Sequence, residues 1–170
     1  MKTISIVAPC YNEEENISEL VNQIEEIFQT ELKDYRYNII FIDNDSNDKT
    51  QEIIKNHAES NKNIKLICNA RNFGHIRSPF HGLISSEGDA SILIATDLQD
   101  PPQLIVDFIE KWEEGYKIVV GSKKETEEGF LMKNMRLFYY YVMEKLTSNR
   151  HINGFTGYGL YDIEVIKELK

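Results

Sequence analysis

The sequence has few cysteines and no long apolar run. Its two cysteines, Cys10 and Cys68, are far apart and form no metal-binding spacing. Small extracellular folds usually carry more cysteines, so we expect free thiols in a reducing, cytoplasmic compartment. No stretch of about 18 consecutive apolar residues occurs, which excludes a membrane-spanning helix within this sequence. The apolar run at 4–8 is too short for a secretory signal and predicts a strand instead.

Basic residues are also scarce, since 19 Lys and Arg stand against 28 Asp and Glu and the net charge is −9. This balance excludes general nucleic-acid binding, because neutralising phosphates requires a basic face. The composition is otherwise that of a globular protein, with 41% hydrophobic and 28% charged residues. A length of 170 residues suits one well-packed domain, and we expect residues 1–170 to form a single domain.

Short apolar runs alternate with amphipathic segments along the chain. The apolar runs predict strands at 4–8, 37–42, 64–68, 91–95 and 116–120. Helical periodicity predicts helices near 17–28, 48–60, 78–86 and 101–115. Strands separated by helices require parallel crossovers. The sequence therefore predicts an α/β fold with a mostly parallel central sheet flanked by helices.

Polar residues follow four of the predicted strands. They are Tyr11-Asn12-Glu13, Asp43-Asn44-Asp45, Arg71-Asn72 and Asp97-Leu98-Gln99-Asp100. Ligands of open α/β sheets collect outside the carboxyl ends of the strands, so we expect a site there. The chain lacks both G-x-G-x-x-G and the P-loop pattern, which disfavours dinucleotide-dependent hydride transfer and Walker-type nucleotide hydrolysis.

The acids at these strand ends have more than one interpretation. Asp43 either accepts hydrogen bonds from a ribose or base, or stabilises a turn. Asp97 and Gln99 offer hard oxygen ligands, which suit Mg²⁺ or Mn²⁺ bridging a nucleotide diphosphate. Asp100 directly precedes two prolines, and this position favours a helix N-cap.

The remaining polar features predict structure rather than chemistry. His75 and His81 stand near a predicted helix start, and isolated histidines are usually packed or hydrogen-bonded. No Ser or Cys is paired with a base, so nucleophilic hydrolysis has no support. Gly121–Gly129 is a long polar connection that forms either a flap or a plain surface loop.

Four motifs at the strand ends resemble family-2 glycosyltransferases of GT-A fold. They are Val7-Ala-Pro-Cys-Tyr-Asn-Glu-Glu-Glu-Asn-Ile17, Ile42-Asp-Asn-Asp-Ser46, Arg71-Asn-Phe-Gly-His75 and Asp97-Leu-Gln-Asp-Pro-Pro102. The resemblance is to the branch of dolichyl- and polyprenyl-phosphate sugar transferases, and it runs from about Ile4 to Asp162. It implies a metal-dependent, inverting hexosyltransferase that moves a sugar from a UDP- or GDP-sugar to an acceptor.

The resemblance also implies roles for particular residues. It implies that the nucleotide donor is bound by Pro9, Tyr11, Glu13, Asp43, Arg71 and Asn72. It implies that Asp97 and Gln99 hold Mg²⁺ or Mn²⁺ and take part in catalysis. Lys123 and Arg136 would join them as catalytic cations that face the phosphates.

Three positions depart from the family pattern. Relatives usually read Asp-x-Asp where this chain has Ala95 before Asp97, so one carboxylate is missing. Asn44 stands where relatives often have an acid after the second strand. Near the end, Thr156-Gly157-Tyr158-Gly159-Leu160 lacks the acid and the arginine of many relatives.

The missing acid at Tyr158 bears on the acceptor. A sugar hydroxyl needs a general base, whereas a lipid phosphate is already anionic and needs positioning more than deprotonation. Asp162 is a fallback base, although a turn or cap role is favoured there. We therefore predict transfer to a polyprenyl phosphate. The alternatives are a transferase that glycosylates a sugar hydroxyl in cell-surface polysaccharide synthesis, and a degenerate nucleotide-sugar-binding module without turnover.

Residues 130–150 combine apolar side chains with Lys133, Arg136, Lys145 and Arg150. A helix of this composition lies at a membrane interface, packs on the sheet, or forms a homo-oligomer interface. The resemblance favours the membrane, because lipid-phosphate acceptors reside there, and it implies a location at the inner face of the cell membrane. The chain ends within a predicted helix, so we also expect a C-terminal truncation.

Overall fold

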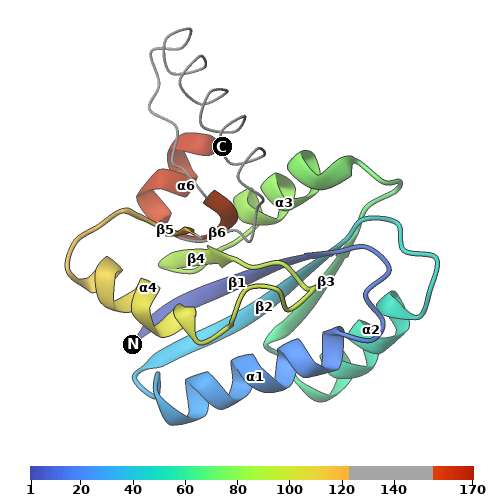
Figure 1. The fold of residues 1–170 in the computed structure, drawn as a ribbon, viewed down its shortest axis with the longest axis horizontal. Coiled ribbons are helices and arrows are strands. Elements are labelled where there is room, and N and C mark those ends of the chain that lie inside the picture. The colour runs from blue at the N-terminus through green and yellow to red at the C-terminus, as the bar shows by residue number, and fades with distance from the viewer. Residues whose placement is uncertain (123–154) are drawn as a thin grey trace, which may run out of the picture. The chain divides into compact units, whose positions relative to one another are not determined.

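The computed structural model describes residues 1–122 and 155–170 (Figure 1). The chain divides into two compact units, Met1–Val120 with Gly157–Lys170, and Gly121–Thr156. All of the described helices lie in the first unit. The predicted membrane segment 130–150 and most of the predicted loop Gly121–Gly129 lie outside the described residues. The single-domain organisation stays a prediction.

Among the described residues, six strands form one sheet in the order β3-β2-β1-β4-β6-β5. Parallel pairing joins β1 (Lys2–Cys10) to β2 (Tyr35–Asp43) and to β4 (Ala90–Leu93), and joins β2 to β3 (Ile64–Cys68). The predicted, mostly parallel α/β sheet is confirmed. The sequence did not reveal β6 (Phe155–Asp162), which pairs antiparallel with β4 and separates it from β5 (Ile118–Ser122).

Helices cover both faces of the sheet (Figure 1). α1 (Ile17–Thr30), α2 (Thr50–Ser60) and α4 (Leu104–Glu113) lie on one face. α3 (Gly74–Ile84) and α6 (Ile163–Leu169) lie on the other. The central strands are therefore buried on both sides, which explains their continuous apolar sequences.

Alternate side chains of these strands enter two separate cores. Ile6, Ala8 and Phe41 join the large core beneath α1 and α4. Val7 and Ile42, one position along each strand, belong to a smaller core on the opposite face. The large core also receives six apolar residues of α1 at the predicted helical spacing, namely Ile17, Leu20, Val21, Ile24, Ile27 and Phe28.

α3 lies unusually close to the sheet. A Cβ atom added to Gly82 would come within 2.5 Å of Ile42 Cγ1 and 2.6 Å of Val7 Cγ1. Only glycine permits this approach without displacing the side chains of Ile42 and Val7. The helix begins four residues before the predicted start at 78 and contains Pro79. Its position fixes the β3–α3 loop at the carboxyl edge of the sheet.

Two acids near predicted helix starts behave differently. Asp162 caps α6 by accepting a 2.9 Å hydrogen bond from the Glu164 amide, and it also accepts one from Trp112 Nε1 at 2.6 Å. The favoured cap role of Asp162 is therefore confirmed. The N-cap prediction for Asp100 is wrong, because α4 begins only at Leu104 and a separate turn carries the two prolines.

Candidate functional site

The carboxyl ends of β1, β2 and β3 lie in register at one edge of the sheet. Cys10 pairs with Asp43, which in turn pairs with Cys68. The Asn44 amide bonds to the Cys10 carbonyl at 2.9 Å, and the Asn69 amide bonds to the Asp43 carbonyl at 2.9 Å. The loops that leave these strands therefore start side by side, as expected for a parallel sheet.

Side chains of the β1–α1 loop and the β2–α2 loop bond reciprocally to each other's backbone. The Asn12 amide donates to Ser46 Oγ at 2.9 Å, while Asn12 Oδ1 accepts from the Asn47 amide at 2.9 Å. The Glu13 amide donates to Thr50 Oγ1 at 2.8 Å. These neutral bonds join the two loops into one layer beside the strand ends.

Two carboxylates complete this layer. Asp48 Oδ2 accepts from the Glu14 amide at 3.2 Å, and Glu14 Oε2 accepts from the Lys49 amide at 2.8 Å. Partial burial opposes the charge of Asp48, but hydrogen bonds from Thr50 and from the Glu14 amide keep its pKa below the ordinary value. Asp48 is therefore ionised at neutral pH and stabilises the loops.

Asp43 points into its own loop. Its side chain is 0% exposed, and its Oδ2 accepts from the Asp45 amide, the Ser46 amide and Gln51 Nε2 at 3.2, 3.1 and 2.6 Å. The sequence allowed two roles for Asp43, ligand binding or stabilisation of a turn, and these hydrogen bonds show that it stabilises the turn. A direct contact between this carboxylate and a nucleoside stays a prediction.

A network of side-chain amides holds the β3–α3 loop against the end of β2. Asn44 Nδ2 donates to Asn72 Oδ1 at 2.9 Å, and Asn44 Oδ1 accepts from Asn69 Nδ2 and the Phe73 amide at 3.2 and 2.9 Å. Asn69 also bonds to Ser78 Oγ at 2.9 Å. Asn44 therefore has a structural function, because its side-chain amide donates one hydrogen bond and accepts two others, which a carboxylate could not do.

Sequence reasoning missed Asn69, although it follows directly after a predicted strand. The strand-end rule that selected Arg71 and Asn72 would also have selected it. His81 Nδ1 lies 3.3 Å from Asn69 Oδ1, so the expected hydrogen-bonding role of His81 is confirmed. His75 is exposed on α3.

The loop after β4 carries the predicted metal ligands. Asp97 and Gln99 are both exposed, and Asp97 Oδ1 accepts from the Gln99 amide at 3.2 Å. Thr96 Oγ1 donates to the Pro9 carbonyl at 3.2 Å and ties this loop to the end of β1. The turn brings both oxygen-bearing side chains to the same edge as the β1 and β2 loops.

Three residues other than glycine have left-handed backbone conformations within the described part of the chain. They are Asn12, Asp45 and Leu98, with φ values of 56°, 71° and 56°. Asn and Asp tolerate this region, whereas a branched apolar side chain such as that of Leu98 rarely adopts it. Such strain costs about 1–3 kcal/mol at a residue and is concentrated at functional sites. All three residues lie in loops at this one edge.

These loops offer few protein ligands for a metal. Ala95 is exposed where a second acid would stand, and no three His, Cys, Asp or Glu side chains come together among residues 1–122 and 155–170. Asp97 and Gln99 fit Mg²⁺ or Mn²⁺ only if a diphosphate and water supply the other positions. Mg²⁺ is usually bound in this way, by one or two carboxylates with substrate phosphates and waters.

The six predicted nucleotide-binding residues all lie at this edge. Tyr11 is 44% exposed, and the half-buried Glu13 accepts from Asn16 Nδ2 at 2.7 Å. Arg71 is exposed and its guanidinium stacks on the Phe73 ring, 4.9 Å from the ring centre. The predicted catalytic cations Lys123 and Arg136 lie outside the described residues.

Tyr158 of β6, where the family resemblance led us to expect an acid, is buried against α4. Its hydroxyl donates to the carbonyl oxygens of Pro101 and Pro102 at 3.3 and 3.4 Å, and its ring meets Phe108 edge-on at 4.8 Å. Burial raises the pKa of Tyr158 far above its usual range, and the Asp100 and Asp107 carboxylates add to this effect. A phenol in this state does not act as a base at neutral pH.

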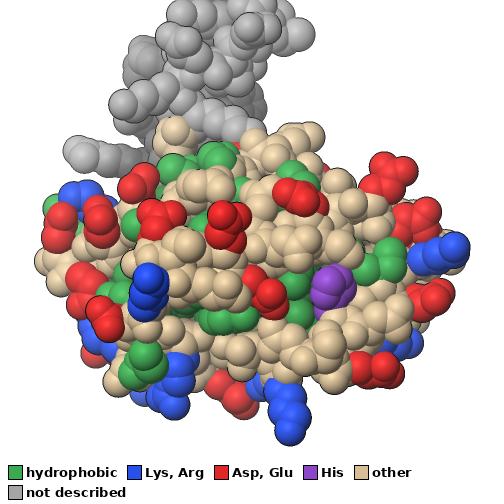
Figure 2. Space-filling view, turned by 90° about the horizontal axis from the view of Figure 1, so that it is seen from below, with side chains coloured by type: hydrophobic (Ala, Val, Ile, Leu, Met, Phe, Trp, Pro, Cys, Tyr) green, Lys and Arg blue, Asp and Glu red, His purple; other side chains and the backbone are tan. Residues whose placement is uncertain are grey.

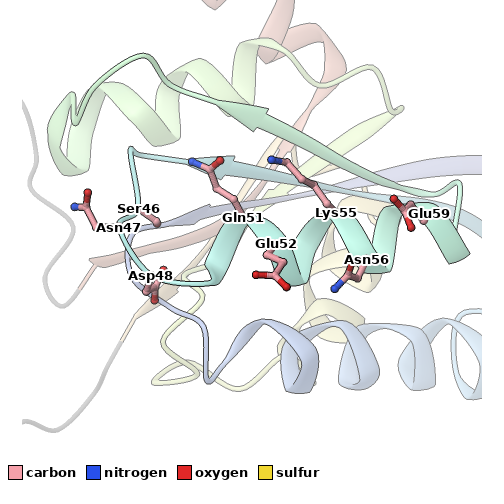
Figure 3. Close-up of a pocket in the computed structure, with 8 residues that line it drawn as sticks. All are labelled: Ser46, Asn47, Asp48, Gln51, Glu52, Lys55, Asn56 and Glu59. Carbon is pink, nitrogen blue, oxygen red and sulfur yellow. The ribbon is translucent and has the colours of Figure 1, made fainter.

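A hollow beside α2 is a separate feature (Figure 3). Its polar lining comes from Ser46, Asn47, Asp48, Gln51, Glu52, Lys55, Asn56 and Glu59. It includes neither Asp97 nor Gln99, and Ser46, Asp48 and Gln51 already bond within the protein. We therefore place the candidate site at the Asp97 loop rather than in this hollow.

The strand order and the polar carboxyl edge define the class of GT-A glycosyltransferases. The structure superimposes on mannosyl-3-phosphoglycerate synthase from Rubrobacter xylanophilus with a TM-score of 0.70 at 20% identity, covering 96% of this chain and 54% of that one. The mannosyltransferase PcManGT from Pyrobaculum calidifontis, solved with GDP-Man and Mn²⁺, gives a TM-score of 0.64 at 18% identity, covering 98% of this chain and 46% of that one. These similarities establish the fold.

The chain belongs to Glycosyl transferase family 2, which matches residues 5–169. The bactoprenol glucosyl transferase of Shigella phage SfV is 34% identical over 168 residues, which cover 98% of this chain and 54% of that protein. The chain spans about half the length of the curated relatives that it matches. The resemblance inferred from four sequence motifs is therefore confirmed at the level of the family.

Proposed function

We propose that this chain forms the catalytic domain of an inverting glycosyltransferase that moves a sugar from a UDP- or GDP-sugar to a polyprenyl phosphate. The observation that carries the proposal is the 34% identity to a bactoprenol glucosyl transferase, which extends over 98% of the chain. The replacement of a family acid by the buried Tyr158 supports the same acceptor.

The acceptor chemistry needs no base. An oxygen of the lipid phosphate forms a bond to the anomeric carbon, and the bond from that carbon to the nucleoside diphosphate breaks with its electron pair. The phosphate oxygen is already anionic at neutral pH, so no proton has to be removed. Tyr158 in its neutral, hydrogen-bonded state is compatible with this reaction, whereas a sugar hydroxyl acceptor would require a base elsewhere.

Asp97 and Gln99 are proposed to hold the metal against the diphosphate of the donor. Bound Mg²⁺ or Mn²⁺ would offset the negative charge that develops on the departing nucleoside diphosphate. The PcManGT structure, which contains Mn²⁺ and GDP-Man, supports a divalent metal in this fold. Both side chains are exposed, so a diphosphate can reach them without displacing the core.

The donor would lie across the loops that follow β1, β2 and β3. Tyr11 offers an exposed ring for stacking on a base, and Arg71 offers a cation to the phosphates. Asp43 would act through the shape of its loop. We further propose that the domain works at the inner face of the cell membrane, where lipid phosphates reside. No helix among the described residues is long and apolar enough to cross a membrane.

A transfer assay tests the proposal. The chain is incubated with radiolabelled UDP-glucose or GDP-mannose and Mn²⁺, with either a polyprenyl phosphate in detergent or a free sugar acceptor. We expect label to enter the lipid fraction from one donor and to be lost with EDTA. Transfer only to the sugar hydroxyl would assign the alternative acceptor. Calorimetric binding of a nucleotide without any turnover would assign the chain to nucleotide-sugar-binding modules.

A further inference from the structure

α3 exposes an apolar strip with a cation in it. Phe73, Ile76 and Phe80 are 38%, 72% and 42% exposed, although most large apolar side chains of the described residues are buried. Together with the exposed Arg77 they follow the spacing i, i+3, i+4 and i+7, which places them on one side of a helix. We define these four residues as the α3 outer face.

The α3 outer face lies in a basic part of an acidic chain. Arg71 and Arg77 are both exposed, and residues 69–86 contain no Asp or Glu, whereas the whole chain has a net charge of −9. The opposite side of the molecule, over α1 and α2, carries many acidic side chains among a few basic ones (Figure 2). The α3 outer face therefore differs in charge from the surface over α1 and α2, while α6, on the same face of the sheet as α3, carries the exposed Glu164 and Glu168.

The α3 outer face begins at the candidate site. The Phe73 amide donates to Asn44 Oδ1 at 2.9 Å, and the Gly74 amide donates to Asn72 Oδ1 at 2.9 Å. From there α3 runs across the sheet, held close to it at Gly82. A surface that binds the α3 outer face would thus meet the edge that carries the predicted donor-binding residues.

We propose that the α3 outer face contacts an anionic lipid bilayer and directs the candidate site toward it. This inference rests on the proposed function, in which the acceptor phosphate is carried by a lipid. The isoprenoid chain stays in the bilayer, so the bilayer surface has to come close to the site. Anionic headgroups attract Arg77 and the nearby Arg71 and repel the acidic side over α1 and α2, and Phe73, Ile76 and Phe80 can enter the interface.

A second copy of this chain fits the α3 outer face less well. A twofold dimer would place each α3 outer face against its own copy and bring the arginines of both chains together. The α3 outer face itself contains no acid that would neutralise them. An anionic bilayer satisfies both the charge and the apolar side chains, so the charge of the strip favours lipid over self-association.

Vesicle co-sedimentation tests the inference without any need for turnover. The full chain is mixed with vesicles of phosphatidylglycerol and phosphatidylcholine, or of phosphatidylcholine alone. We expect binding to the anionic vesicles that weakens with added salt. The double variant Ile76→Ser, Arg77→Glu is expected to lower the partition coefficient by roughly thirty-fold or more, because it reverses one charge and removes an apolar anchor.

A matched control changes the same chemistry at other exposed positions. Lys62→Glu with Tyr116→Ser reverses one charge and removes one large exposed side chain outside the α3 outer face. We expect this pair to change binding far less than the α3 pair. Two further variants each introduce one tryptophan, Ile76→Trp and Tyr116→Trp. We expect brominated lipids to quench the fluorescence of the tryptophan at position 76 but not that of the tryptophan at position 116.

Several outcomes would overturn the inference. One is that the variant Ile76→Ser, Arg77→Glu binds anionic vesicles as well as the wild type. Another is that this variant and the control variant lose vesicle binding equally. A third is that the α3 variant changes its oligomeric state and not its vesicle binding. Failure of the proposed function gives a different result, because transfer to a short, detergent-soluble polyprenyl phosphate would then be absent in the wild-type chain. Vesicle binding without sugar transfer would therefore contradict the proposed function alone. Sugar transfer without vesicle binding would contradict the lipid-contact inference alone.

Discussion

The Tyr158 hydroxyl donates a hydrogen bond to the carbonyl oxygen of Pro101 at 3.3 Å. Tyr158 belongs to β6, while Pro101 follows the loop that carries Asp97 and Gln99. Tyr158 therefore holds, through Pro101, the end of the loop that carries the predicted metal ligands. We therefore expect Tyr158 to act on the position of that loop rather than on a proton of the acceptor.

Tyr158→Phe tests this role. Removing the hydroxyl leaves two carbonyl oxygens without this donor, and we expect the free energy of unfolding to fall by about 1 kcal/mol. The rate of sugar transfer should change much less than it does when a general base is removed, which typically costs about 100-fold or more. Urea unfolding and the transfer assay measure the two effects. A loss of turnover of that size with a normal unfolding curve would assign Tyr158 to the chemistry.

Asp97→Asn is expected to abolish metal-dependent nucleotide binding while leaving stability nearly unchanged. The side chain is exposed, so its loss of charge disturbs no packing. The measurement is calorimetric titration of UDP and GDP with Mn²⁺ and again with EDTA. Asp107→Asn, at an exposed position of α4, provides the matched control and should bind like the wild type. Equal metal dependence in Asp97→Asn would move the metal site elsewhere.

Ala95→Asp supplies the carboxylate that the family resemblance leads us to expect at this position. Ala95 is exposed two residues before Asp97, so the new side chain meets no core residue. A second charged ligand should tighten Mn²⁺ binding in the presence of nucleotide by about an order of magnitude. Titration of Mn²⁺ into the nucleotide-saturated protein measures the change. Unaltered Mn²⁺ affinity would show that position 95 does not face the metal, whatever its place in the motif.

Asp162→Asn should remove part of the pH dependence of stability. Burial opposes the charge of Asp162, but hydrogen bonds from Trp112, the Glu164 amide and Lys117 keep its pKa below the ordinary value. A lowered pKa in the folded state stabilises the protein above the unfolded pKa of about 3.9, and this contribution is lost as the pH falls through the folded pKa.

We therefore expect Asp162→Asn to be less stable than the wild type by about 1–3 kcal/mol at neutral pH, with the difference shrinking below about pH 4. Urea unfolding across this pH range measures it. Asp34→Asn, at an exposed position, should show no such convergence. A difference that stays constant down to low pH would mean that the charge of Asp162 is not responsible.

The two thiols should differ in reactivity. Cys10 is 3% exposed, and burial together with the Asp43 carboxylate raises its pKa far above the ordinary value. Cys68 is exposed, but partial burial and Asp43 raise its pKa as well. A thiol reagent should thus modify one cysteine in the native chain, slowly at neutral pH and faster as the pH rises, and both in denaturant. Mass spectrometry identifies the site, and modification of native Cys10 would contradict the buried position.

Much of the fold was predictable because its strands are buried on both faces. The run at 64–68 was predicted with the observed bounds of β3, and β1 and β2 extend their predicted runs by a few residues. β6 was not predictable in the same way. Gly157 and Gly159 weaken its strand signal, yet Gly159 is needed there because a Cβ atom would lie 2.7 Å from the Val119 carbonyl oxygen.

The location of the candidate site was predictable, but the direction of its side chains was not. The strand-end rule selected the loops that contain Asp43, Asn72 and Asp97. Whether an acid points outward, as Asp97 does, or into its own loop, as Asp43 does, depends on hydrogen bonds within the folded loop. The role of Asn44 depended likewise on Asn69 and Asn72, which meet it only in the folded protein.

The reciprocal bonds between the loops after β1 and β2 have an evolutionary consequence. Asn12 and Glu14 hold the backbone of Asn47 and Lys49, while Ser46 holds the backbone of Asn12. A substitution in either loop therefore acts on the conformation of the other, and its effect depends on which residues stand there. Segments more than thirty positions apart are thus bound by epistasis, so either loop can be exchanged with that of a homologue only if its counterpart is exchanged with it.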